Sequence, residues 1–256
     1  AGGRITSPVI AGDGIDAYVA APCGTGSPTW RLRVQDDESG RFAWWAEIPG
    51  AAGTPSIGGG RLFVVSGGRL VAYDTEGCGA ESCAPEWTYS PPGVSLFGRP
   101  AVTPGGQVVV SAYDQAGPPE RPFSRSMVRV LAADTGTEQW STLVEAPGSE
   151  SSQQGFAVDG DTVFVVGTPS VFAGRRDRLA AYPLAGCGAA ACPPAWIAPL
   201  GDFPGVAGPV VGGDVVVVDG GPEVLAFPAE GCGAAECGEL HSVPLPSSAG
   251  ALALAD

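Results

Sequence analysis

The sequence predicts an all-β fold built from repeated sheets, as in a propeller or a solenoid, and three observations lead to this prediction. A strand–turn–strand pattern recurs five times at a spacing of roughly 40 to 50 residues, the range typical of these architectures. The apolar runs are short, β-branched and bounded by Gly-Gly, Gly-Asp or Pro-Gly, as in strands joined by tight turns. No window carries a helical period, and the 40 Gly and 25 Pro among 256 residues leave little room for long helices.

Each repeat has two halves. The first half follows the pattern P-x-[VI]-x-G-G-x-[VL]-[FV]-V-V, as in TPSIGGGRLFVV and GPVVGGDVVVV. The second half is an apolar strand, a small polar turn and a tryptophan position. Its copies are the looser RLRVQDDESGRFAWW (31–45) and the clearer RLVAYDTEGCGAESCAPEW (69–87), VRVLAADTGTEQW (128–140), RLAAYPLAGCGAAACPPAW (178–196) and VLAFPAEGCGAAECGELH (224–241). The two halves alternate along nearly the whole chain, which predicts a single domain over residues 1–256.

The repeats predict five full units followed by one incomplete unit. The full repeats are expected at 6–48, 53–90, 98–146, 153–200 and 205–245. Residues 247–256 resemble the opening strand of a sixth repeat or a strand that closes a ring. Three arrangements stay open: five units close on themselves, the chain belongs to a larger propeller, or its open strand edges pair with another copy.

A tryptophan lies four residues after the turn glycine or second cysteine in four repeats, at Trp44, Trp87, Trp140 and Trp196. The only histidine, His241, holds the equivalent position in the fifth repeat. We expect the tryptophans to pack between neighbouring sheets rather than against a cofactor. The repeat position accounts for His241 without a catalytic role, so no hydrolytic triad is predicted.

Six of the seven cysteines form three pairs with the spacing C-G-x-x-x-C at the same point of three repeats. The pairs are Cys78 with Cys83, Cys187 with Cys192, and Cys232 with Cys237. Zinc sites usually gather four ligands, whereas these pairs lie in separate repeats, so we expect a disulfide across each turn. Disulfides indicate an oxidising compartment, hence a secreted or cell-envelope protein. Cys23 is predicted to be unpaired at this spacing, and a free thiol, a bridge to another chain or a partner outside this sequence all stay open.

Charge narrows the class of partner. The 13 basic residues are all Arg and face 27 acidic residues, for a net charge of −14, which opposes binding to nucleic acid or anionic membranes. No apolar run has the length of a transmembrane segment. The opening AGGRITSP lacks the features of a signal peptide, as expected of a mature or trimmed chain.

The turn pattern [AL]-x-[AY]-x-D-x-x-T-G-x-x-x-W, clearest in VLAADTGTEQW, resembles the repeat of PQQ-like (quinoprotein-type) β-propellers. In VAYDTEGCGAESCAPEW a cysteine turn replaces the Thr-Gly of that pattern. The resemblance implies a ring of four-stranded antiparallel blades in a secreted bacterial protein. Quinone-dependent dehydrogenases, outer-membrane assembly scaffolds and other secreted proteins share this architecture, so the fold does not choose among them.

The dehydrogenases of this family typically combine adjacent disulfide-bonded cysteines, a tryptophan against the quinone, and calcium held by Glu, Asn and Asp. This chain has no adjacent cysteines and no asparagine, and it is about half their usual size. Calcium loops are also absent from the sequence. We therefore expect no catalytic, cofactor-binding or metal-binding residues, and predict a non-catalytic binding or assembly scaffold in the non-dehydrogenase branch. The alternatives are a quinone-dependent oxidoreductase and a self-assembling structural subunit joined through open strand edges.

Long loops between the second and third strands of a repeat are the expected recognition sites. They cover residues 21–29, 113–127 and 167–178. Because the third and fourth repeats are expected to be neighbours, their loops should gather five arginines and two phenylalanines. The candidate partner-binding residues are Arg121, Phe123, Arg125, Phe172, Arg175, Arg176 and Arg178. Such a cluster would suit carboxylate, phosphate or sulfate groups of a protein or other anionic partner, and the alternative is a set of solvated loops with ordinary surface charges.

Overall fold

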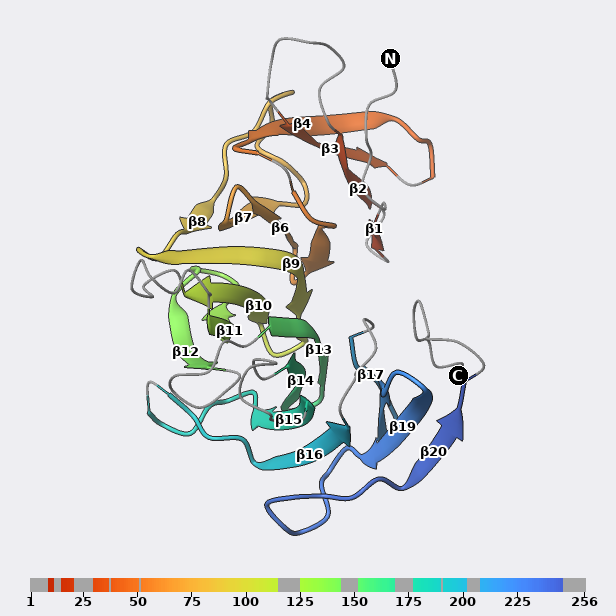
Figure 1. The fold of residues 1–256 in the computed structure, drawn as a ribbon. Coiled ribbons are helices and arrows are strands. Elements are labelled where there is room, and N and C mark those ends of the chain that lie inside the picture. The colour runs from red at the N-terminus through yellow and green to blue at the C-terminus, as the bar shows by residue number, and fades with distance from the viewer. Residues whose placement is uncertain are drawn as a thin grey trace. The chain divides into compact units, whose positions relative to one another are not determined.

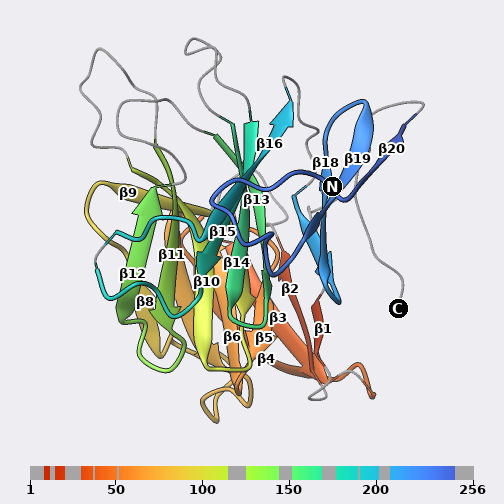
Figure 2. The same cartoon turned by 90° about the horizontal axis from the view of Figure 1, so that it is seen from below.

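The structure is a computed structural model. It describes residues 9–11, 15–20, 30–36, 38–50, 52–114, 125–143, 152–168, 177–189, 191–201 and 208–245. These residues form strands, turns and bends without a helix, and the strands make five four-stranded antiparallel sheets (Figure 1). In each sheet, strands that follow one another along the chain lie side by side (Figure 2). The predicted all-β fold of propeller blades is confirmed, whereas residues 247–256, predicted to form a partial or closing strand, lie outside the described residues.

The sheets are named blades 1 to 5 in chain order. Blade 1 contains β1 (Val9–Ala11), β2 (Ile15–Ala20), β3 (Trp30–Asp36) and β4 (Phe42–Ile48). Blade 2 contains β5 (Ser56–Gly58), β6 (Arg61–Ser66), β7 (Arg69–Asp74) and β8 (Trp87–Tyr89). Blade 3 contains β9 (Val94–Val102), β10 (Gln107–Asp114), β11 (Arg125–Ala132) and β12 (Glu138–Leu143). Blade 4 contains β13 (Ser152–Asp159), β14 (Thr162–Thr168), β15 (Asp177–Pro183) and β16 (Trp196–Gly201), and blade 5 contains β17 (Val210–Gly212), β18 (Val215–Asp219), β19 (Glu223–Pro228) and β20 (His241–Pro244).

Paired glycines make the tightest hairpins of blade 2. Gly67 and Gly68 join β6 to β7 with φ angles of 58° and 77°. A two-residue turn of this kind needs positive φ at both central residues, which only glycine adopts without strain. The turn fixes the register in which Ser66 lies opposite Arg69 and Val64 opposite Val71. The Gly-Gly pairs of the sequence therefore set which side chains share a face of the blade.

The chain divides into two compact units, and each has its own core. One unit comprises Ala1–Tyr113 with Val130–Gln139, and the other comprises Asp114–Arg129 with Trp140–Asp256. In the first unit, Leu32 and Val34 of blade 1 pack with Leu62 and Val64 of blade 2. Strand alternation explains this, because every second residue points to the same face. The hydrophobic core thus lies between the facing surfaces of consecutive blades.

The core of the second unit repeats the same design between blades 4 and 5. Its blade 4 members are Phe164, Val166, Leu179, Ala181, Trp196, Ala198 and Leu200, and its blade 5 members are Val216, Val218, Leu225, Phe227 and Cys237. The presence of the second cysteine of a turn in this core shows that the cysteine turns contribute to packing between blades as well as closing a loop.

Candidate functional site

The predicted partner-binding cluster falls largely outside the described residues. Arg121, Phe123, Phe172, Arg175 and Arg176 are not among them, and neither is Cys23. Arg125 opens β11, and Arg178 lies exposed in β15. The described strand bounds do place the three long connections between β2 and β3, β10 and β11, and β14 and β15, as expected. The gathering of these arginines stays a prediction.

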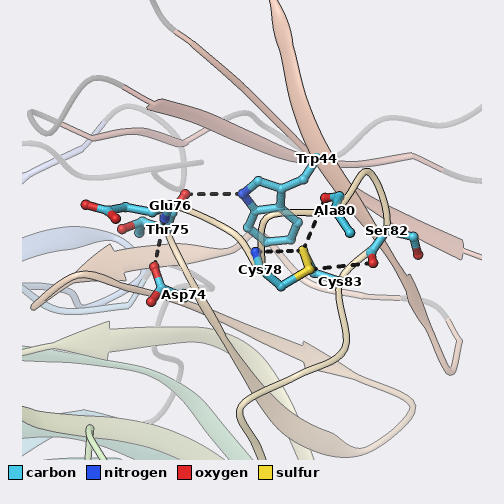
Figure 3. The surroundings of a disulfide bond; sticks show 8 residues. All are labelled: Trp44, Asp74, Thr75, Glu76, Cys78, Ala80, Ser82 and Cys83. Carbon is cyan, nitrogen blue, oxygen red and sulfur yellow. Dashed lines mark hydrogen bonds between the residues drawn. A yellow bond between two sulfur atoms is a disulfide. The ribbon is translucent and has the colours of Figure 1, made fainter.

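The tryptophan of each repeat docks on the turn of the next blade. In the first case, the indole Nε1 of Trp44 donates a hydrogen bond to the carbonyl oxygen of Thr75, 3.2 Å away (Figure 3). The ring lies so close to Gly77 that a Cβ there would be 2.6 Å from Trp44 Cδ1, and Gly77 also has a φ of +81°. Position 77 therefore requires glycine for two reasons, the positive φ of the turn and the close approach of the ring.

The same docking recurs at the following junctions. The Nε1 of Trp87 donates a hydrogen bond to the carbonyl oxygen of Ala133 over 3.2 Å, and its ring lies over Gly136. The Nε1 of Trp140 donates to the carbonyl oxygen of Leu184 over 2.7 Å, and its ring lies over Gly186. The ring of Trp196 lies over Gly231. The predicted packing of these tryptophans between neighbouring sheets is thus confirmed. The glycine of T-G in the cysteine-free turn and the glycine that precedes the first cysteine in the other turns are equivalent, because each lies under the ring.

Each predicted cysteine pair forms a disulfide, and their Cα atoms are 5.6 Å apart in all three turns. Cys83, Cys192 and Cys237 are buried, whereas Cys78, Cys187 and Cys232 are exposed. In the first turn the backbone N–H of Cys78 donates to Cys83 Sγ over 3.0 Å, which orients the two ends of the loop (Figure 3). The three predicted disulfides are confirmed.

The cysteine turn of blade 2 also hydrogen-bonds to the outer strand of blade 1. The backbone N–H of Trp45 donates to Glu81 O over 2.9 Å, and the N–H of Cys83 donates to Trp45 O over 2.9 Å. Together these bonds form a parallel bridge between Trp45 and Ser82. The disulfide-closed loop therefore clasps the preceding blade by backbone hydrogen bonds that satisfy an otherwise open strand edge.

Two further clasps join later blades. The N–H of Ile197 donates to Ala235 O over 2.9 Å, and the N–H of Cys237 donates to Ile197 O over 2.8 Å, so blade 5 clasps blade 4 in the same way. At the junction of blades 3 and 4, Thr142 Oγ1 donates to Cys192 O over 2.8 Å. Sequence reasoning missed these contacts, because the cysteine spacing reports closure of the turn and carries no information about the neighbouring strand.

Arginines and aromatic rings alternate on the face of blade 1 that points away from blade 2. Arg31 lies over the Trp45 ring at 4.2 Å from its centroid, and Arg33 lies over Phe42 at 5.7 Å. Arg31 also pairs with Glu47 at 3.9 Å. These contacts are exposed, so they contribute little to stability, but they hold two cations on one surface.

Among the described residues, the carboxyl of Asp36 and the phenol of Tyr73 have a shifted pKa. Hydrogen bonds from the side chain and backbone N–H of Ser39 lower the pKa of the exposed Asp36 carboxyl. Burial raises the pKa of Tyr73 to about 12, because its phenolate would lose its hydration in the core between blades 1 and 2. Tyr73 belongs to the junction of blades 1 and 2, whereas Asp36 lies at an exposed turn of blade 1.

Asp219 is a buried carboxylate at the end of β18. Its side chain is 1% exposed, and Oδ1 accepts a hydrogen bond from the N–H of Gly221 over 2.9 Å. Oδ2 is buried and has no hydrogen-bond partner among the described residues. A buried carboxylate oxygen without a partner is unfavourable by itself, so this position is one where a donor is expected.

The described residues do not provide the ligands expected for a quinone and its calcium ion. Its described residues contain no group of three or more His, Cys, Asp or Glu placed to hold a metal ion. The full sequence also lacks adjacent cysteines and asparagine. The donors that hold calcium and quinone together in the dehydrogenases are therefore not matched by this part of the chain. The described residues also contain no apolar helix of membrane-spanning length.

No family model matches the sequence, and no curated protein matches it. Solved structures do match in fold. They include a quinohemoprotein alcohol dehydrogenase from Comamonas testosteroni (TM-score 0.64, 12% identity, 93% of this chain and 42% of that one) and a europium-containing methanol dehydrogenase (TM-score 0.62, 12% identity, 94% and 51%). A prolyl endopeptidase structure also matches (TM-score 0.56, 14% identity, 96% and 35%). This chain therefore spans about half, or less, of the length of these structures.

These comparisons correct one prediction and support another. The prediction that the chain is not an enzyme is contradicted, because the structures similar to it are dehydrogenases and an endopeptidase. It was wrong because it rested on the missing motifs of one enzyme family, although a propeller frame serves many activities. At 12% identity the likeness shows the frame and assigns no reaction. The chain has a β-propeller fold, as its repeats predicted, and this fold is similar to that of the two dehydrogenases.

Proposed function

We propose that this chain is an extracytoplasmic binding scaffold, a disulfide-clasped propeller that presents its long loops to an anionic partner. The observation that carries the proposal is the clasp. Each of three cysteine turns closes a disulfide and at the same time hydrogen-bonds to the preceding blade. A frame fixed in this way holds loops of irregular sequence in constant positions, which recognition surfaces require.

The disulfides support a place outside the cytoplasm, secreted or in the cell envelope. Three bridges in one chain persist only where thiols are not kept reduced. The exposed half of each bridge would be open to attack by a cytoplasmic dithiol, and the buried half would then leave its place beside the docked tryptophan. The clasps therefore suit an oxidising compartment.

The position of the long loops supports recognition at one end of the strands. The connection from β6 to β7 is a two-residue Gly-Gly turn, whereas the connections from β10 to β11 and from β14 to β15 are long. The latter two hold Arg121, Arg175 and Arg176. In a chain of net charge −14, the β14–β15 connection (169–176) has two arginines and no acidic residue, which suits carboxylate, phosphate or sulfate groups.

Chromatography on immobilised heparin tests this proposal. We expect the oxidised chain to be retained despite its acidic charge, and the double variant R175A/R176A to elute at lower salt with an unchanged Tm. The matched control is R41A, because Arg41 is exposed at a cysteine-free turn at the opposite end of its strands. Equal elution of wild type and R175A/R176A would overturn the assignment of the loops.

A titration with the quinone cofactor tests the oxidoreductase alternative. The chain would be titrated with pyrroloquinoline quinone and calcium, and the quinone absorbance and the mass of the complex recorded. Stoichiometric uptake would replace the scaffold proposal by the quinone-dependent alternative. The scaffold proposal expects heparin retention that depends on Arg175 and Arg176, without quinone uptake.

A further inference from the structure

The three disulfides share one asymmetry, which sets where an external thiol attacks them. The first cysteine of each turn is exposed and the second is buried. Exchange begins when a thiolate reaches one sulfur of the bridge, so the exposed sulfur is the one attacked and the buried sulfur is the leaving group. In blade 4 the attacked sulfur belongs to Cys187 and the leaving sulfur belongs to Cys192.

The turn of blade 4 has backbone groups that support the leaving sulfur. The N–H of Cys187 donates to Cys192 Sγ over 2.8 Å, and such a donor stabilises the negative charge that the sulfur gains when the S–S bond breaks. The carbonyl oxygen of Ala189 lies 3.8 Å from the same sulfur, where a protonated thiol donates to it weakly. Blades 2 and 5 have the equivalent contacts, so this geometry is common to the three turns.

The three turns differ in charge. Those of blades 2 and 5 each have a glutamate two residues before the first cysteine and another inside the loop, and all four glutamates are exposed. They are Glu76, Glu81, Glu230 and Glu236. Blade 4 has Ala185 in the first of these positions, and no charged residue occurs from 184 to 196. Because the attacking species is a thiolate, the acidic turns repel it more strongly than the neutral turn does.

The hairpins beside the turns do not remove this difference. The N–H of Leu184 donates to the carbonyl oxygen of Asp161, which brings one acidic residue beside the turn of blade 4. In blade 5 the N–H of Ala229 donates to the carbonyl oxygen of Asp214 in the same way. Blade 5 therefore has such an aspartate in addition to its two glutamates, and the two glutamates of blade 2 also exceed the single aspartate of blade 4.

The turn of blade 4 is also tied differently to the preceding blade. In blade 2 two backbone hydrogen bonds form the clasp, from Trp45 to Glu81 and from Cys83 to Trp45, and blade 5 has an equivalent pair. The turn of blade 4 is held by a side chain, since Thr142 Oγ1 donates to Cys192 O over 2.8 Å. Among the described residues, no backbone hydrogen bond joins this turn to β12. A turn held by fewer bonds opens at a lower free energy, which favours exchange at its bridge.

We propose that the disulfide of blade 4 is a site of thiol–disulfide exchange with an external dithiol, and that its reduction releases Trp140 from the turn. A thiolate sulfur of the dithiol bonds to Cys187 Sγ, the bond to Cys192 breaks, and its electron pair passes to Cys192 Sγ, which takes up a proton. The second thiol of the reagent then attacks the mixed disulfide and releases Cys187 as a thiol. The dithiol is oxidised to a disulfide by two electrons, and its two protons end on the two cysteines.

Trp140 is the group that reduction affects, because it rests on the same turn. Its Nε1 donates to Leu184 O over 2.7 Å, and its Cδ1 lies 2.7 Å from the place that a Cβ of Gly186 would take. Gly186 is the neighbour of Cys187 in the chain. Trp140 and the turn also belong to the same compact unit. Opening the bridge therefore loosens the hold of the turn on β12, whatever partner the long loops bind.

Timed reduction with dithiothreitol tests the proposal. The full oxidised chain would be reduced for increasing times and alkylated, and peptide mass spectrometry would give the open fraction of each bridge. At low ionic strength we expect the blade 4 bridge to open about tenfold faster than the other two. The ratio should fall in about 1 M salt, where charges are screened beyond about 3 Å. Equal rates for the three bridges, or faster opening of an acidic turn, would overturn the proposal.

Two substitutions at Ala185 separate charge from structure. This residue is exposed, and its counterparts are Glu76 and Glu230, so the position accepts a long side chain. A185E should slow the opening of the blade 4 bridge about threefold at low ionic strength. A185Q is the matched control, because it has nearly the same shape without the charge, and it should open at the wild-type rate. Equal rates for A185E and A185Q would overturn the electrostatic basis of the selectivity.

Hydrogen exchange tests the release of Trp140. The variant C187S/C192S lacks the blade 4 bridge and keeps the other two, and selectively reduced wild type gives the same state without a substitution. In both samples the amides of residues 138–143 should exchange about tenfold faster than in the oxidised wild type. The amides of β7 are the control and should keep their rates, because the bridge beside them stays closed. Unchanged exchange of residues 138–143 in both samples would overturn the release of Trp140.

Discussion

Two junctions of the first unit differ in the turn that receives the tryptophan. Trp44 docks on the cysteine turn of blade 2 and is 2% exposed, whereas Trp87 docks on the cysteine-free turn of blade 3 and is only half-buried. Both indoles donate to a backbone carbonyl over 3.2 Å, and both lie against a glycine of positive φ. Docking therefore does not require the disulfide. The cysteine loop adds a lid of backbone and sulfur that encloses the ring.

Removing the rings should show the largest difference between the two junctions. W44A leaves a cavity in the core shared by blades 1 and 2 and should lower the free energy of unfolding by about 4 kcal/mol. W87A should cost about half as much, because its half-buried ring leaves space that solvent can fill. Urea unfolding of the oxidised variants measures both. Equal losses would contradict the claim that the cysteine loop encloses Trp44 more fully.

Filling the space under the docked ring should be nearly as severe. G77A forces a Cβ to within 2.6 Å of Trp44 Cδ1 at a φ of +81°, so strain and overpacking combine to about 3 kcal/mol. G79A is the matched control, because Gly79 has a φ of +75° but nothing within 4 Å, which leaves the strain of about 1 kcal/mol alone. If both variants lost the same stability, contact with the ring would not be what requires Gly77.

Opening the clasp should have a moderate effect. The double variant C78S/C83S loses the constraint of a short loop, worth about 2 kcal/mol in the chain-entropy model. Its amide of Trp45 should also exchange faster with solvent, because the acceptor Glu81 O is held in place by the closed loop. The amide of Gly136, in the cysteine-free turn, serves as the control and should keep its exchange rate. Unchanged protection of Trp45 would mean that the clasp does not depend on the disulfide.

The sequence predicted those features that depend on residues close together in the chain. Cys78 and Cys83 are close in the chain, so their pairing follows from the spacing, and Trp44 follows its turn at the same distance in each repeat. The bridge between Trp45 and Ser82 was not predictable in this way, because it joins two blades through backbone groups that every residue carries. The burial of strand residues also escaped the repeat pattern. Val243 and Ala198 are both apolar, and each lies two residues after the tryptophan position of its repeat, but Ala198 packs in the core between blades 4 and 5 whereas Val243 is 58% exposed.

The candidate partner site shows a different limit. The lengths of the second-to-third strand connections could be predicted, since Gly-Gly turns and long polar segments are distinct in sequence. The side-chain arrangement of Arg121, Arg175 and Arg176 could not, because irregular loops have no period that fixes direction. The expectation of no catalytic role failed for a related reason. A missing sequence motif argues against the chemistry of one family only, whereas activity depends on which residues the propeller fold brings together.

Alkaline titration should give the smallest effect and probes the same junction without altering the clasp. Burial raises the pKa of Tyr73 to about 12, above the ordinary value of 10.0, so the folded chain holds the phenolic proton more tightly than the unfolded chain does. The stability that depends on this proton is fully present below pH 10 and is lost as the pH rises towards 12. At pH 11 the loss should be about 1.4 kcal/mol, one pKa unit of linkage, in the wild type and absent in Y73F. Urea unfolding of both proteins at neutral and alkaline pH isolates this term, because all other ionisable groups are shared. If the free energy of unfolding fell equally in wild type and Y73F, Tyr73 would have access to solvent at the junction. The cysteine loop would then enclose Trp44 but not Tyr73.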